Sequence, residues 1–232
     1  MFDKLAHHIP QGYASLPVEG ATMWVGTADT DCTATKALQR LAGVALREVI
    51  RLLRFEPRRQ IHVVMYSSLA DSELALSRKV SPTFLMAPLH TPESAVIVIH
   101  SPRLDPRNGD PSRMLRHLCH EVSHVCAAER TGSTKRLGDG NAGMRLRPWV
   151  DEGLAVCVAA EAAGQHDVIE RALAAGFETP SSMDVVDSEL CALDSERRSW
   201  AFGVATSLVW AAKQRHGFRT VFDHLDEPKR WS

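Results

Sequence analysis

Two histidines and a glutamate stand at a spacing that suits metal-dependent hydrolysis. The segment reads His120-Glu121-Val122-Ser123-His124. On a helix, residues four apart project side by side, so both imidazoles can reach one metal ion. Glu121 follows the first histidine directly, and there its carboxylate can take a proton from a water on the metal. The pattern predicts a metal site, although a solvated polar helix face would carry the same residue types.

The sequence marks both ends of the helix that must hold these residues. Asp110 suits the N-cap, Pro111 suits the first helical position, and Gly132 stands just past the expected end. At about 100° per residue, one face is apolar. It comprises Leu115, Leu118, Cys119, Val122 and Cys126. His117, His120 and His124 share the opposite face, so we expect a core on one side and chemistry or water on the other.

The order of the surrounding elements indicates an α+β fold, with strands and a helix first and helices only afterwards. Runs of β-branched residues predict strands at 22–26, 60–66 and 95–100. An apolar stripe predicts a helix at 36–54, capped by Thr33 or Thr35. Two segments are expected to form loops: 1–20, which is rich in chain breakers, and the glycine-rich 131–147 beside the cleft. Further helices are expected at 70–79, from Pro148 onward, and at 166–175, 183–193, 195–216 and 218–225.

Length and composition are those of an ordinary globular protein. The 232 residues are 44% hydrophobic and 24% charged, and 27 basic residues nearly balance 28 acidic ones, so no overall field favours nucleic acid or an anionic membrane. The first residues show no export signal, and no run approaches the roughly 18 apolar residues that span a bilayer. Five cysteines without a framework spacing suit reduced thiols. We expect a cytoplasmic protein with neither nucleic-acid nor membrane partners, and the sequence leaves the oligomeric state open.

A second motif adds a family resemblance. Trp149-Val-Asp-Glu-Gly-Leu-Ala155 opens the next expected helix, and Glu152 stands 28 residues after His124. His-Glu-x-x-His followed by Trp-x-x-Glu-Gly-x-Ala resembles the gluzincin branch of zinc metallopeptidases, in the thermolysin-like clan, over roughly residues 60–225. The resemblance implies a zincin-like fold: a small mixed sheet with a packing helix and the active-site helix, then a mainly helical lobe. We therefore expect a single domain of residues 1–232. Its first lobe, residues 1–130, would hold the sheet and the active-site helix, and its second lobe, residues 131–232, would be helical and carry the third ligand.

The resemblance implies one zinc ion per chain, held by His120, His124 and Glu152, and no other cofactor-binding residues. Two neutral imidazoles and one carboxylate leave a fourth position open for water, as catalytic zinc requires. Asp151 is also a carboxylate and remains an alternative ligand. Acidic residues in a first helical turn can also simply complement the helix dipole.

The chain departs from related patterns at several positions. Metzincins extend the motif with a glycine and a third histidine, where this chain has Ala127 and Arg130. Val156 stands where thermolysin-like enzymes place an aspartate, so the sequence identifies no outer partner for the histidines.

The tyrosine that similar small gluzincins use beside the oxyanion is replaced by Trp200, whose indole donates one hydrogen bond but cannot ionise as a phenol does. Trp200 fits cleft lining or core packing, and Tyr66 and Tyr13 are weak substitutes. His117, on the polar face of the motif helix, could contact substrate or simply be solvated.

The resemblance implies peptide-bond hydrolysis by metal-activated water, with Glu121 as general base and a peptide or protein as substrate. It also implies that strand 95–99 is the sheet edge that pairs with an extended substrate; the alternative for this strand is an ordinary core strand. Two alternatives stay open: an interaction protein that kept the fold but lost most or all hydrolysis, and a metal hydrolase of non-peptide amides. Cleavage specificity and the choice between endopeptidase and exopeptidase action are not set by the sequence.

Overall fold

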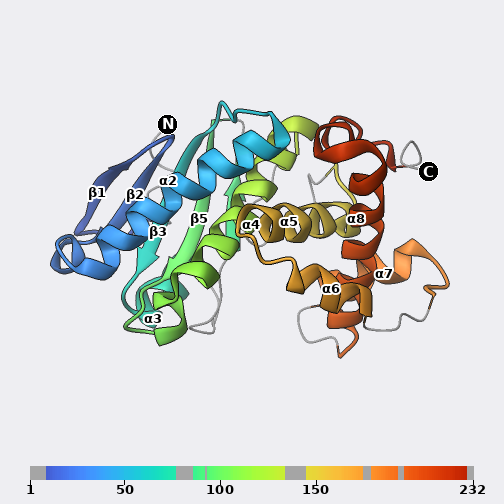
Figure 1. The fold of residues 1–232 in the computed structure, drawn as a ribbon. Helices are drawn as coiled ribbons and strands as arrows, with labels where there is room; N and C mark the ends of the chain where they lie inside the picture. The colour runs from blue at the N-terminus through green and yellow to red at the C-terminus, as the bar shows by residue number, and fades with distance from the viewer. Residues whose placement is uncertain are drawn as a thin grey trace.

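The structure is a computed structural model that describes residues 9–76, 86–91, 93–133, 145–174, 179–192 and 196–228. A sheet with two long helices packed on one face forms one half of the molecule, and helices alone form the other (Figure 1). The predicted α+β class is confirmed. Within the described ranges, no helix combines the length and the apolar character needed to cross a bilayer.

The sheet is five-stranded and mixed, in the order β1-β2-β3-β5-β4. Its strands are β1 (Tyr13–Val18), β2 (Ala21–Gly26), β3 (Gln60–Tyr66), β4 (Met86–His90) and β5 (Ser94–His100). β2, β3 and β5 run parallel to one another, and β1 and β4 flank them in antiparallel pairing. β3 and β5 are buried along nearly their whole length, which explains their continuous apolar runs.

The loop predicted for residues 1–20 is wrong, because β1 lies within it and pairs with β2 across a turn at Gly20, where φ is +76°. β4 was not predicted either. Each of these strands contains a proline, Pro17 in β1 and Pro88 in β4, and each lies at an edge of the sheet. Proline lacks an amide hydrogen and is tolerated at an edge, where one side of the strand forms no ladder. These prolines marked edge strands rather than loops.

The strand at 95–99, expected to be the sheet edge, is internal. β5 pairs with β3 on one side and with β4 on the other. Its backbone groups are therefore engaged on both sides, and it cannot add an extended peptide. In the described part of the sheet the edge beside it is β4.

Two long helices cover one face of this sheet, α2 (Thr33–Leu53) and α4 (Pro111–Thr131). α2 begins with Cys32 as its N-cap, not with the expected Thr33 or Thr35: the Cys32 sulfur accepts from the Thr35 amide at 3.3 Å. α3 (Leu69–Leu76) begins one residue before the helix expected at 70–79, whose last residues lie outside the described part. Short 3₁₀ segments, η1 (Thr27–Asp29) and η2 (Pro106–Gly109), complete this half.

The second half consists of helices, as the sequence predicts. They are α5 (Pro148–Ala162), α6 (Asp167–Ala174), α7 (Met183–Cys191) and α8 (Arg198–Asp223). The helices expected at 195–216 and 218–225 are joined in α8, with a break at Gly217, where φ is +77°. α5 lies between α4 and α8 and packs against both (Figure 1). Most of the predicted glycine-rich loop 131–147 lies outside the described residues.

Candidate metal centre

α4 fixes the two motif histidines because both its ends and its apolar face are anchored. The Asp110 carboxylate accepts from the amides of Ser112 and Arg113 at 3.0 and 3.4 Å, and Gly132 ends the helix with φ +66°. Most of the predicted apolar face is buried in the main core: Leu118, Cys119, Val122 and Cys126, with Leu115 partly buried against it. The predicted helix is therefore confirmed, and its polar face turns toward α5.

The start of α5 is held by another helix. Arg147, at the N-cap, gives no side-chain hydrogen bond to cap it. Instead the Asp187 carboxylate of α7 accepts from the Trp149 amide at 2.8 Å and from the Arg147 guanidinium at 2.8 Å. Asp187 thus supplies the N-terminal cap that α5 lacks, one turn before Glu152.

Gly153 allows α5 and α8 to touch. A Cβ atom at this position would lie 2.5 Å from the Ala205 carbonyl oxygen and 2.7 Å from a Val209 methyl carbon. The first of these neighbours is backbone and cannot rotate away. The glycine that follows Glu152 is therefore required by helix packing and not by an unusual backbone angle.

Three side chains from α4 and α5 converge on one point. The two Nε2 atoms of His120 and His124 are 3.1 Å apart, and Glu152 Oε2 lies 3.4 Å from the first and 3.7 Å from the second. A triangle with these edges has its centre about 2.0 Å from each atom, which matches zinc–nitrogen and zinc–oxygen bonds of about 2.0–2.2 Å. The imidazoles meet edge to face, at 85°. The spacing and the donor types of these residues fit a metal ion.

Asp151 contacts the other side of His124. Its Oδ1 lies 2.9 Å from His124 Nδ1, while Nε2 of the same ring points to the cluster. A carboxylate in this position favours a proton on Nδ1, the tautomer whose Nε2 lone pair is available to a metal. The sequence identified no outer partner for the histidines, and Asp151 lies at that position beside His124. Glu152 lies with the two histidines in the cluster, at the position expected for a third ligand.

The electrostatic environment of the cluster favours a positive charge. Burial by itself lowers the pKa of His124, but the charges of Asp151, Glu152 and Glu121 outweigh it and raise that pKa to about 10. Three carboxylates around one largely buried imidazole thus stabilise a cation at this point. A divalent ion supplies this positive charge while leaving both imidazoles neutral, as metal ligation requires.

Glu121 is buried, with 6% of its surface exposed. Its charge acts on His124, yet within the described part of the chain its carboxylate has no hydrogen bond and no ion pair. A carboxylate beside the cluster that is not held by another side chain is free to accept a proton during a reaction.

Trp200 lies in the first turn of α8, half-buried and packed against the main core, with the Arg197 guanidinium carbon 4.2 Å from its ring centroid. These contacts favour the packing interpretation over cleft lining. Tyr66 belongs to the smaller core on the sheet face opposite α4, and Tyr13 packs beside it with ring centroids 6.1 Å apart, so neither tyrosine reaches the cluster. His117 lies one turn before His120 on the same face of α4, outside the cluster itself.

No protein-family profile, no curated protein sequence and no solved structure matches this chain. We therefore infer function from the chemistry of the cluster. Two imidazoles and one carboxylate suit zinc, and they also bind other divalent ions such as cobalt or manganese.

Proposed function

We propose that this chain is a zinc-dependent metallopeptidase of the gluzincin type, with a zincin-like fold. One observation carries the proposal: Nε2 of His120, Nε2 of His124 and Oε2 of Glu152 surround a point about 2.0 Å from each. They come from the two sequence signatures that characterise this family. Neither signature alone would bring three ligand atoms to bonding distance of a common point.

The roles of the residues follow from their positions. When bound, zinc supplies a Lewis acid that polarises the scissile carbonyl and acidifies a water. Glu121 accepts the proton of the attacking water and returns it to the leaving amine. Asp151, 2.9 Å from His124 Nδ1, keeps that histidine oriented and neutral at Nε2. The three carboxylates supply the negative field that retains the cation.

The edge strand β4 is the proposed place for the substrate backbone. It lies at the end of the described sheet and packs beside α4. An extended peptide can pair with an exposed strand edge through main-chain hydrogen bonds, which give affinity without fixing the sequence. This replaces the internal strand at 95–99 in the same role.

The direct test is metal analysis of the purified chain beside two variants. We expect about one zinc per chain in the parent protein and in Glu121→Gln, and much less in Glu152→Ala. Hydrolysis of a peptide library, followed by mass spectrometry, should be seen in the parent protein, abolished by a chelator, restored by zinc, and absent in Glu121→Gln. Hydrolysis that persists in Glu121→Gln would contradict the assigned base.

A second candidate is a zinc-holding interaction protein with little or no hydrolytic activity. It is favoured by Trp200, which packs against the core and Arg197 where the family often has an oxyanion-stabilising tyrosine. The same library separates the two: full zinc occupancy without any cleavage would favour this candidate. If the protein instead hydrolysed amides that are not peptides, the metal hydrolase of non-peptide amides would be favoured.

A further inference from the structure

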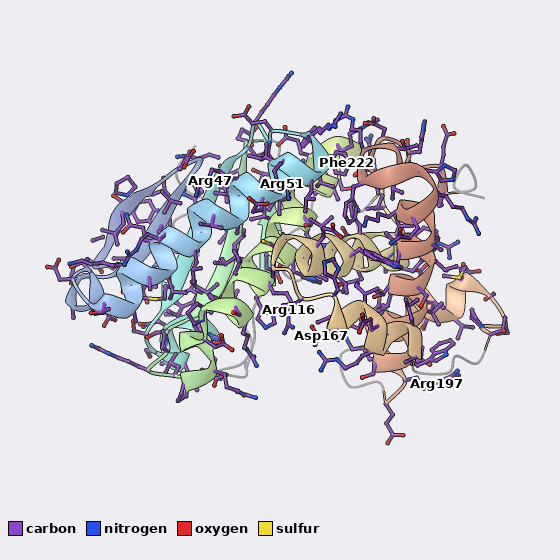
Figure 2. All side chains as sticks on the ribbon, in the orientation of Figure 1. Arg47, Arg51, Arg116, Asp167, Arg197 and Phe222 are labelled. Atoms are coloured by element: carbon purple, nitrogen blue, oxygen red, sulfur yellow. The ribbon has the colours of Figure 1, made fainter. Side chains whose placement is uncertain are left out.

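A strip of two arginines and a histidine extends the face of α4 that carries His120 and His124 toward the N-terminus of the helix. Arg116 is one turn before His120, and Arg113 and His117 occupy the adjoining positions of the same face. All three side chains are half-buried. Figure 2 labels Arg116 in the space between α4 and α6, near Asp167 at the start of α6.

The donors of this strip are largely unused. Arg116 Nη1 donates to Gln165 Oε1 at 2.7 Å, which occupies one of the five guanidinium hydrogens. Arg113 Nε and His117 Nε2 are buried and have no hydrogen-bond partner among the described residues. Arg113 Nε always carries a hydrogen, and a buried donor without a partner is costly, so this group is expected to have an acceptor that the described part of the chain does not supply.

The charges of Asp110 and Asp167 act on Arg116, but the close contacts of both carboxylates are made with other groups. Asp110 caps α4 through the amides of Ser112 and Arg113, and Asp167 pairs with Arg171 at 2.8 Å. Burial, Arg113 and Arg116 together lower the pKa of His117 to about 4, so it adds no charge near neutral pH.

The strip is also unfavourable for the helix itself. Arg113 lies in the first turn of α4, where the positive end of the helix dipole repels cations, and Arg116 lies in the second turn. They are three residues apart, a spacing at which like charges destabilise a helix. Helix stability does not explain these two arginines, and an anionic ligand does.

The position of the strip sets which anion it can meet. One helical turn advances about 5.4 Å, so Arg116 and Arg113 lie about one and two turns before His120 along α4. Successive residues of a substrate are about 3.8 Å apart. We propose that Arg113 and Arg116 bind a substrate carboxylate one or two residues from the scissile bond, either the peptide's terminal carboxylate or an acidic side chain. This inference rests on the proposed zinc peptidase function.

The test uses zinc-loaded protein and three hydroxamates: acetohydroxamate, the monohydroxamate of glutaric acid, and the corresponding amide of that compound. Each binds zinc through the same group, and only the second adds a carboxylate. Calorimetric titration should show the carboxylate probe binding roughly tenfold more tightly than the amide, since a charge-assisted hydrogen bond adds this much. Arg113→Gln combined with Arg116→Gln should abolish the difference and leave acetohydroxamate binding unchanged.

Arg40→Gln is the matched control, because Arg40 is an exposed arginine of α2 and its loss should preserve the tenfold preference. Equal affinity for acid and amide probes, or a preference that survives the double variant, overturns the carboxylate subsite while leaving the zinc site intact. Failure of all three hydroxamates to bind overturns the zinc site, and the subsite with it.

The source of the carboxylate is then read from peptide pairs. Loss of cleavage on C-terminal amidation identifies the terminal carboxylate. Loss on Asp→Asn replacement next to the cleaved bond identifies an acidic side chain. Cleavage that is unaffected by both changes overturns the inference.

Discussion

Gly153→Ala tests whether close packing of α5 on α8 positions the third ligand. The added methyl carbon would lie 2.5 Å from the Ala205 carbonyl oxygen, 2.9 Å from the Ala205 carbonyl carbon and 2.7 Å from a Val209 methyl. Ordinary carbon–oxygen contacts are about 3.3 Å or longer, so α8 must move by nearly 1 Å. Overpacking costs about 1–3 kcal/mol, and a rigid backbone neighbour places this case at the upper end.

The net effect is smaller, because alanine favours a helix interior over glycine by about 1 kcal/mol. We therefore expect Gly153→Ala to lower the free energy of unfolding of the metal-free protein by about 2 kcal/mol in urea titrations. Glu152 is the adjacent residue, and metal bonds tolerate errors of only about 0.2 Å. Zinc affinity, measured by competition with a chromogenic chelator, should fall at least tenfold.

Gly43→Ala is the matched control for this experiment. Gly43 lies inside α2, and a Cβ there would meet its nearest neighbours at 3.8 Å, an ordinary contact distance. This variant should gain up to about 1 kcal/mol of stability from helix propensity alone and bind zinc as the parent does. If Gly153→Ala matched the parent in both stability and zinc affinity, close helix packing would not be what positions Glu152.

Three further predictions concern residues around the centre and the sheet. Asp151→Asn should retain zinc with about 10- to 100-fold weaker affinity in chelator competition, and complete loss of zinc would show that Asp151 is itself a ligand. Asp187→Ala removes the cap of α5 and should cost about 1 kcal/mol in urea unfolding, where unchanged stability would argue against the cap. Burial lowers the pKa of His62 below 6.5, and Trp24 donates to its Nδ1 at 3.1 Å. The stability this histidine contributes is present above about pH 6.5 and is lost as the pH falls through its folded pKa, so His62→Gln should flatten the acid side of the stability profile in urea unfolding.

Local signals in the sequence were sufficient for the helix that holds the histidines. Asp110, Pro111 and Gly132 each act within a few residues of their own position, and the apolar face follows from a single helical period. The same holds for β3 and β5, whose buried runs need no knowledge of their neighbours. These elements are predictable because their chemistry is contained in one short segment.

The remaining features depend on contacts between distant segments. Asp187 caps a helix that begins 39 residues earlier, and nothing around Asp187 in the sequence signals that contact. Asp151 and Glu152 are adjacent carboxylates, and only the packing of α5 on α4 determines which one reaches the cluster and which reaches His124 Nδ1. β1 and β4 were missed because proline disfavours strands in general but not at edges, and being an edge is a property of the whole sheet.

The proposed ligands are divided between the two halves of the molecule. His120 and His124 belong to α4, which packs against the sheet, while Glu152 belongs to α5, which packs among the C-terminal helices (Figure 1). A zinc ion held by all three would thus act as a crosslink between the halves. At a free zinc concentration 1,000 times the Kd, this linkage is worth about 4 kcal/mol. The two halves should then unfold in a single transition in the zinc-loaded protein, with a melting temperature that rises with free zinc.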